Sequence, residues 1–171
     1  MPSRRLPSAT LALACLVAAS AVQAEDRRDF WSINAGIAWA WDDHMFRDFD
    51  GNDIATFASG TWGVGPDFMP EWMGYETELG LTLTDGRWLG EDWSMQHLGS
   101  YLTGQWGSER LYLKLRGGVA YNRVKVGSFS GDDFGIAGGA GLGFQILGQP
   151  LEVHFNAIDG DVTTITAHWH F

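Results

Sequence analysis

The sequence predicts an all-β fold, an eight-stranded antiparallel up-and-down β-barrel that crosses a membrane. Three observations predict this fold. Apolar and polar residues alternate along many segments, which is the period of strands with two different faces. After the N-terminal segment, no apolar run approaches the roughly 18 residues of a membrane-spanning helix. The 171 residues also include 23 glycines and nine tryptophans, which is unusual for a soluble enzyme.

The first 24 residues have the parts of a secretory signal peptide. Two arginines precede the apolar run 11–19, and small residues precede the expected cleavage after Ala24. The run is too short to span a membrane as a helix. The single cysteine, Cys15, is lost with the signal, so residues 25–171 are expected to form an exported barrel domain without thiols.

Eight segments of the remaining chain are expected to be strands. The last is the clearest, because apolar residues at odd positions alternate with mostly polar residues at even positions up to the terminal Phe171. Residues 72–84, 110–122 and 151–158 repeat the pattern, and four other segments show it more weakly. In chain order the expected strands are residues 30–41, 61–67, 72–84, 95–106, 110–122, 134–146, 151–158 and 163–171.

The connections between these strands alternate in length. Tight turns are expected at residues 70–71, 107–109 and 148–150, which are rich in Gly, Pro and Ser. Longer acidic loops are expected at 42–60, 85–94 and 125–133, with a short one at 159–161. Tight turns at one end and long loops at the other are typical of barrels in bacterial outer membranes.

Alternation alone does not say which face of the barrel meets lipid, because a soluble barrel would turn its apolar face inward. The polar face has few lysines and many small or aromatic residues, which makes a poor soluble surface. Tryptophans gather near strand ends, where a membrane girdle requires amphipathic rings. We therefore expect the apolar face to point outward, with a girdle formed by Trp39, Trp41, Trp72, Trp106 and Trp169.

Several runs resemble the small eight-stranded outer-membrane β-barrel family of the OmpA/OmpX type. They are WGVGPDF at 62–68, GYETELG at 74–80, YLTG at 101–104, LYLKLRGGVAY at 111–121, FGIAGGAGLGF at 134–144, EVHFNAIDGD at 152–161 and HWHF at 168–171. The likeness spans nearly the whole exported chain, but its motifs specify a fold and carry over no catalytic residues. The sequence departs from the family pattern in its long first loop and at His168 and His170.

This resemblance implies a location in the outer membrane of a Gram-negative bacterium. The expected partners are outer-membrane lipids, lipopolysaccharide and the barrel-assembly machinery, with Phe171 as the C-terminal assembly signal. We expect a monomer. The formal net charge of −10 argues against nucleic-acid binding, and acidic loops would meet anionic lipopolysaccharide only through divalent cations.

An apolar outer face implies a polar interior. The side chains expected to form this interior polar network are Glu76, Glu78, Lys114, Arg116, Glu152, His154 and His168, with His170 beside them. Because buried charges must be paired and hydrogen-bonded, we expect a salt-bridged plug. The alternative is a small ion-conducting pore that opens when these pairs exchange partners.

Enzyme and metal functions have weaker support, and we expect no catalytic residues, cofactor or bound metal. A lipid A-modifying enzyme is the less favoured alternative; its triad would use His44 with Asp42 or Asp43 and one of Ser59, Ser94, Ser128 or Ser130. Residues 48–53 match only the start of a calcium loop. His168 and His170 share a strand face and could bind a transition metal, although hydrogen bonding is the expected use. The expected function is a structural or surface-interaction role.

Overall fold

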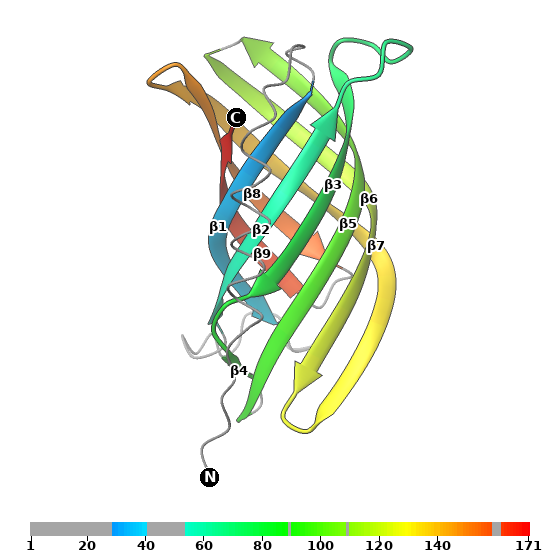
Figure 1. Ribbon diagram of the computed structural model, residues 1–171, viewed down its shortest axis with the longest axis vertical. Coiled ribbons are helices and arrows are strands. Elements are labelled where there is room, and N and C mark those ends of the chain that lie inside the picture. The colour runs from blue at the N-terminus through cyan, green and yellow to red at the C-terminus, as the bar shows by residue number, and fades with distance from the viewer. Residues whose placement is uncertain (1–28, 41–53, 89, 109, 159–161) are drawn as a thin grey trace.

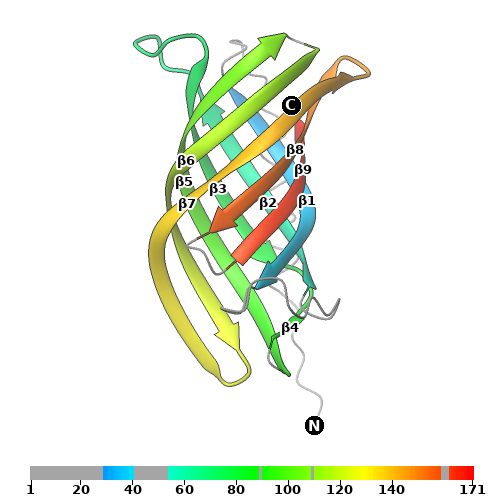
Figure 2. The ribbon, with the colours of Figure 1, turned by 180° about the vertical axis from the view of Figure 1, so that it is seen from behind.

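The computed structural model describes residues 29–40, 54–88, 90–108, 110–158 and 162–171. The described residues form strands that wind around a barrel (Figures 1 and 2). The strands are β1 (Phe30–Ala40), β2 (Ile54–Val64), β3 (Met73–Thr82), β4 (Gly86–Trp88), β5 (Glu91–Ser108), β6 (Leu111–Val126), β7 (Phe129–Ile146), β8 (Gln149–Ile158) and β9 (Val162–His170).

The sheet closes on itself. Apart from β3 and β4, strands that follow each other along the chain pair antiparallel; β1 also pairs with β9, and both β3 and β4 pair with β5. The short β4 therefore continues the line of β3, and the barrel has eight strand positions. This confirms the predicted fold. Closure gives the backbone groups along the wall hydrogen-bond partners inside the sheet, which a lipid environment requires.

The two ends of the barrel differ, as Figure 1 shows. The end that holds the connections 65–72, β5–β6 and β7–β8 and the C-terminus is called here the turn end; the opposite end, with β4 and the β6–β7 hairpin, is the loop end. At the turn end, Leu147 and Gly148 have φ of 53° and 83°, the left-handed conformations that a two-residue hairpin turn requires.

Side chains alternate between lumen and exterior. Along β6, Tyr112, Lys114 and Arg116 are buried while Leu113 and Leu115 are exposed. Other strands follow the same rule, so the outer wall is apolar and the inner wall mostly polar. The exposed apolar side chains include Leu79, Leu98, Leu102, Val119, Leu142, Val153, Phe155 and Ile165. The barrel thus has the orientation of a membrane protein. Among the described residues, no helix has the length and apolar character to cross a bilayer.

Three predicted boundaries were wrong. Strand β2 begins at Ile54, not at residue 61, because small residues hid its alternation. The predicted loop 85–94 contains β4 and the start of β5. The predicted loop 125–133 is a tight turn around Gly127, with β6 and β7 pairing as far as Val126 and Phe129. On β6 Val124 and Val126 alternate with polar residues and pack against the buried cluster, whereas residues 130–133 of β7 are polar or Gly, so the β7 side showed no apolar periodicity that would mark a strand.

The lumen has two layers. Apolar side chains gather in its loop half, where β1, β6 and β8 end and β2, β5 and β9 begin, together with the buried polar residues His97, Asn122 and Thr163. This apolar layer consists of Ala38, Ala55, Phe57, Trp93, Met95, Tyr101, Ala120, Ala137, Ile158 and Val162. Ionised and polar side chains occupy the half toward the turn end. The sequence analysis did not predict an apolar layer inside the barrel.

Candidate functional site inside the barrel

A chain of ion pairs crosses the lumen between strands that are not neighbours. On β6, Lys114 Nζ lies 2.5 Å from Glu76 Oε1 on β3 and 3.1 Å from Glu152 Oε2 on β8. Arg116 Nη2, also on β6, lies 2.6 Å from Glu78 Oε2. All five side chains are buried. The predicted inward residues of three strands are therefore joined in one network.

Neutral groups donate hydrogen bonds to, or accept them from, three of these charged side chains. Ser59 donates a hydrogen bond to Glu78, the Tyr112 hydroxyl donates to Glu152, and Arg116 Nε donates to Asn156. The Arg116 guanidinium also lies 4.4 Å above the Tyr101 ring, a cation–π contact. Hydroxyls, amides and rings thus surround ions that would be costly to bury alone.

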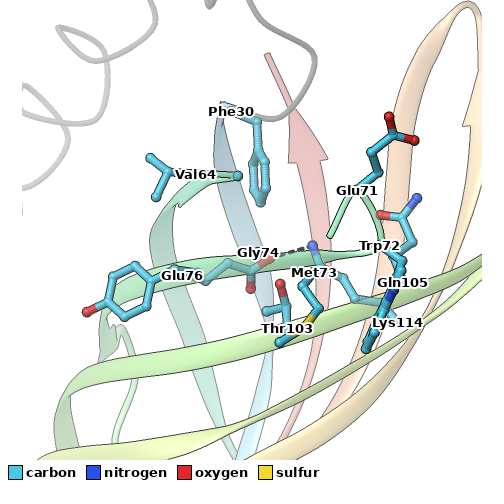
Figure 3. A pocket seen from close by; sticks show the side chains of 12 residues that line it. Phe30, Val64, Glu71, Trp72, Met73, Gly74, Glu76, Thr103, Gln105 and Lys114 are labelled. Carbon is cyan, nitrogen blue, oxygen red and sulfur yellow. Dashed lines mark ion pairs between the residues drawn. The ribbon is translucent and has the colours of Figure 1, made fainter. Parts of the chain in front are cut away.

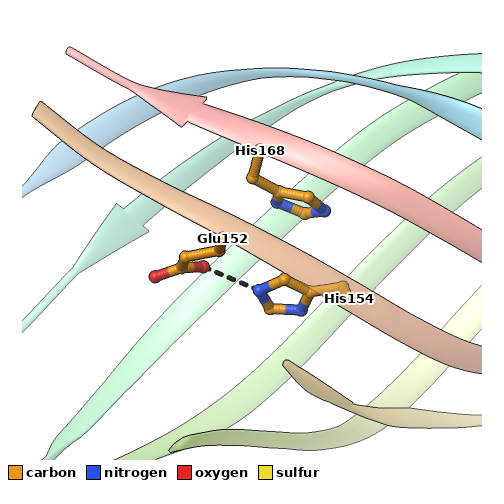
Figure 4. A group of neighbouring side chains, drawn as sticks. All are labelled: Glu152, His154 and His168. Carbon is orange, nitrogen blue, oxygen red and sulfur yellow. Dashed lines mark hydrogen bonds and ion pairs between the residues drawn. The ribbon is translucent and has the colours of Figure 1, made fainter. Parts of the chain in front are cut away.

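Glu152, His154 and His168 form a second group beside Lys114 (Figure 4). His154 Nε2 lies 2.7 Å from Glu152 Oε2, and the rings of His154 and His168 stack with their centroids 4.2 Å apart. Thr166 shares a hydrogen bond with His168 Nε2. His170 joins the group, with Nε2 3.3 Å from the same Glu152 oxygen.

Glycines on β7 make room for this group. The inward positions Gly139, Gly141 and Gly143 carry no side chain, and a Cβ at Gly141 would lie 2.7 Å from the His154 ring. A Cβ at Gly143 would collide with the Tyr112 ring. The glycine-rich run in the sequence therefore matches the large polar side chains of the neighbouring strands.

A cavity of about 210 Å³ opens at the turn end above the ion pairs (Figure 3). Phe30, Trp72 and Gln105 line its sides, and Glu76 and Lys114 lie at its base. The cavity leads from the turn end to the charged network.

The structure separates the predicted girdle into two levels. Three of the predicted tryptophans, Trp72, Trp106 and Trp169, lie toward the turn end, and Trp31 and Trp62 lie at the same level. The ring centroids of Trp72 and Trp106 are 5.5 Å apart, and those of Trp31 and Trp62 are 5.9 Å apart. Trp39 lies at the other end of β1, and Trp41 falls outside the described residues. From Trp31 to Trp39, β1 runs roughly 26 Å, or about 20 Å along the axis at a tilt of about 40°, slightly less than the usual apolar band of about 25 Å.

The residues considered for catalysis and calcium binding are not assembled in the described part of the chain. Ser59 was expected on a loop, but it lies in β2 inside the barrel and bonds to Glu78 and Asn34. Ser94 and Ser130 lie in strands and Ser128 lies in the β6–β7 turn. His44, its neighbouring aspartates and the segment 48–53 fall outside the described residues.

The predicted polar network left out several residues that belong to it. Tyr101, Tyr112, Asn34 and Asn156 all bond within it. The alternation already places each of them on the polar face of its strand, but it does not show which uncharged residues bond to the charged ones. The pairing of Lys114 with both Glu76 and Glu152 had no such signal, because it depends on which strands face each other across the lumen.

Comparisons with known proteins agree with this architecture. A family model described as outer membrane protein beta-barrel domain matches residues 9–165. No curated protein matches the sequence. The crystal structure of neisserial surface protein A superposes with a TM-score of 0.55 at 11% identity, over 83% of this chain and 95% of that one.

The attachment invasion locus protein Ail of Yersinia pestis gives a TM-score of 0.52 at 16% identity, over 84% of this chain and 99% of Ail. Its complex with the heparin analogue sucrose octasulfate gives 0.53 at 14% identity, over the same shares of the two chains. These likenesses show the fold. With the family match over most of its length, the chain belongs to the outer membrane protein beta-barrel domain family.

Proposed function

We propose that this outer-membrane barrel is a closed protein of a Gram-negative cell surface, with a structural or surface-interaction role. The observation that carries the proposal is the set of buried side chains inside the barrel. Three carboxylates and two cations are paired across one half, and the apolar layer around Phe57 and Trp93 lies in the other. An eight-stranded barrel leaves an interior just wide enough for such side chains.

An ion that crossed this barrel would meet both layers in series. It would have to separate Lys114 from Glu76 or Glu152, which leaves charges unpaired in a confined space. It would then have to pass the buried rings of Phe57 and Trp93 with its hydration shell removed. Two such barriers favour a closed barrel over a pore.

Planar-bilayer recording of the refolded chain tests the closed state. Folding is checked first by heat-modifiable gel migration. We expect no conductance steps from the wild type. The variant Trp93→Ala/Lys114→Ala, which removes one side chain from each layer, is expected to give brief openings if it folds. Regular single-channel steps from the wild type would overturn the proposal.

The β6–β7 hairpin supports the surface-interaction part. Strand β8 pairs with β7 only from Ala137 onward, so residues 129–136 of β7 have no strand on that side among the described residues. Phe129 and Ile136 on this segment are 82% and 80% exposed. An open strand edge with exposed apolar side chains is a surface to which another protein can add a strand.

A shortened hairpin tests this role. Replacing residues 123–132 with Asn-Gly keeps the pair Asn122–Asp133 and removes Phe129 with half of the open edge, residues 129–132. It also removes the β6 partners of residues 93–96 on β5, so folding of the variant is checked by heat-modifiable gel migration. Cells that express this variant are expected to adhere less than wild-type cells to a surface coated with serum proteins, at equal surface levels. Equal adhesion would count against the hairpin as the interaction surface.

The charge of the chain bears on the class of partner. Ail has been crystallised with a sulfated heparin analogue. This chain has 21 acidic against 11 basic residues, so polyanions should be repelled from its loops unless divalent cations bridge them. We expect lipopolysaccharide contacts to weaken when Mg²⁺ and Ca²⁺ are chelated. Assembly as a monomer by the barrel-assembly machinery is part of the same proposal.

A further inference from the structure

Two neighbouring strands place four metal-ligand side chains on one patch of the inner wall. Glu152 and His154 alternate along β8, and His168 and His170 alternate along β9. The register puts Glu152 directly opposite His168. One ligand atom each from Glu152, His154 and His168 lies within 4.8 Å of the others (Figure 4), and all four side chains are buried.

We propose that this group is a transition-metal site of the zinc and copper class. Two imidazoles and a carboxylate are a common ligand set for Zn²⁺ and Cu²⁺. The nearly parallel rings of His154 and His168 must tilt toward each other to share an ion. His170 is placed to give a fourth ligand, since its Nε2 lies 3.3 Å from Glu152 Oε2.

Unused hydrogen-bonding capacity supports the site. Among the described residues, His154 Nδ1 is buried and has no hydrogen-bond partner. Buried polar atoms are nearly always paired, so this nitrogen needs an explanation. A bound metal supplies one, because it can take either ring nitrogen of His154 once the ring turns.

The charge balance of the lumen also favours a cation at this position. Within the described part of the chain, the buried carboxylates are Glu76, Glu78 and Glu152, whereas Lys114 and Arg116 are the buried Lys and Arg side chains. Arg116 pairs with Glu78, and Lys114 is shared between Glu76 and Glu152. The surplus negative charge therefore falls at Glu152, beside the imidazoles. A proton on a histidine is the competing way to compensate it.

The turn-end cavity supplies a route of entry. Its base is formed by Glu76 and Lys114, and Lys114 also contacts Glu152 (Figure 3). The Phe30 ring on its wall lies 4.5 Å from the His170 ring. An ion that enters from the turn end would reach the ligands past Lys114 and the Phe30–His170 pair.

Metal titration of the refolded, untagged chain tests the site. Isothermal titration with Zn²⁺ after chelator treatment is expected to show one site per chain, and the variants Glu152→Gln and His168→Gln are expected to weaken it at least about ten-fold. His97→Gln removes a buried histidine outside the group. His44→Ala removes a histidine that the sequence analysis expected in the first loop and that falls outside the described residues. Both variants should bind like the wild type. No binding by the wild type, or loss of binding in either control, would overturn the site.

A spectroscopic measurement on the wild type keeps the test independent of how the variants fold. Electron paramagnetic resonance of bound Cu²⁺ is expected to show hyperfine splitting from at least two imidazole nitrogens. A spectrum with oxygen ligands alone would mean adventitious binding to acidic loops and would refute the proposal. Neither measurement depends on conductance or adhesion, so the closed-barrel proposal can fail while the metal site stands.

Discussion

Lys114→Met is predicted to be one of the most destabilising changes that leave the lipid-facing wall intact. Lys114 Nζ contacts Glu76 at 2.5 Å and both oxygens of Glu152 at 3.1 and 3.2 Å, and its side chain is 5% exposed. Without it, Glu76 keeps only Arg116 Nη1, 3.8 Å away. Removing one partner of a buried ion pair typically costs about 3–5 kcal/mol, which is a hundred-fold or more in the folding equilibrium.

An ion pair at the surface of the same strand gives the matched control. Arg123 Nε lies 3.6 Å from Asp132, but the two side chains are 58% and 53% exposed. Arg123→Met makes the same chemical change in water and is expected to cost about 0–1 kcal/mol. Both cations lie on β6, so the difference between the two costs reports the burial of the pair.

The assay is equilibrium unfolding of the refolded barrel by urea in lipid vesicles, followed by tryptophan fluorescence and by gel migration. The double variant Lys114→Met/Glu76→Gln should be more stable than Lys114→Met alone, because one of the unpaired carboxylates is neutralised. If Lys114→Met costs no more than Arg123→Met, water reaches the network freely and the reasoning about a dry, paired interior is refuted.

Three further predictions concern the wall. Leu102→Arg, at mid-height on the lipid face, is expected to lower the free energy of unfolding in vesicles by about 2–4 kcal/mol. Gln96→Arg on the same strand should lower it by about 0–1 kcal/mol. Equal costs would contradict the assigned membrane band. Gly36→Ala should destabilise the barrel by about 1–3 kcal/mol, because the added Cβ would collide with the backbone of Ile165 on β9. Gly117→Ala is the control, since a Cβ there meets open space. Equal stability of the two variants in the same unfolding assay would argue against the β1–β9 seam. Deleting Phe171, whose backbone N–H donates to the Trp31 carbonyl, should lower the heat-modifiable form in membrane fractions; unchanged levels would contradict its role as an assembly signal.

The fold could be predicted because its rule is local. Residue i and residue i+2 of a strand share a face, so Leu113 and Leu115 were expected on one side of the wall and Lys114 and Arg116 on the other. The strand prediction failed where apolar and polar residues do not alternate clearly. Small residues hid the start of β2, and the β6–β7 hairpin looked like a loop because residues 130–133 of β7 show no apolar alternation.

The sequence by itself therefore determined the class of fold, the outward apolar face and the list of charged residues inside. Only the tertiary structure decided which of them meet. Lys114 joins Glu76 and Glu152, and Glu152 faces His168, because strand order, stagger and closure bring these side chains across or along the lumen. The apolar layer at Trp93 has the same origin, since alternation says that a side chain points inward but not at what height it meets the others.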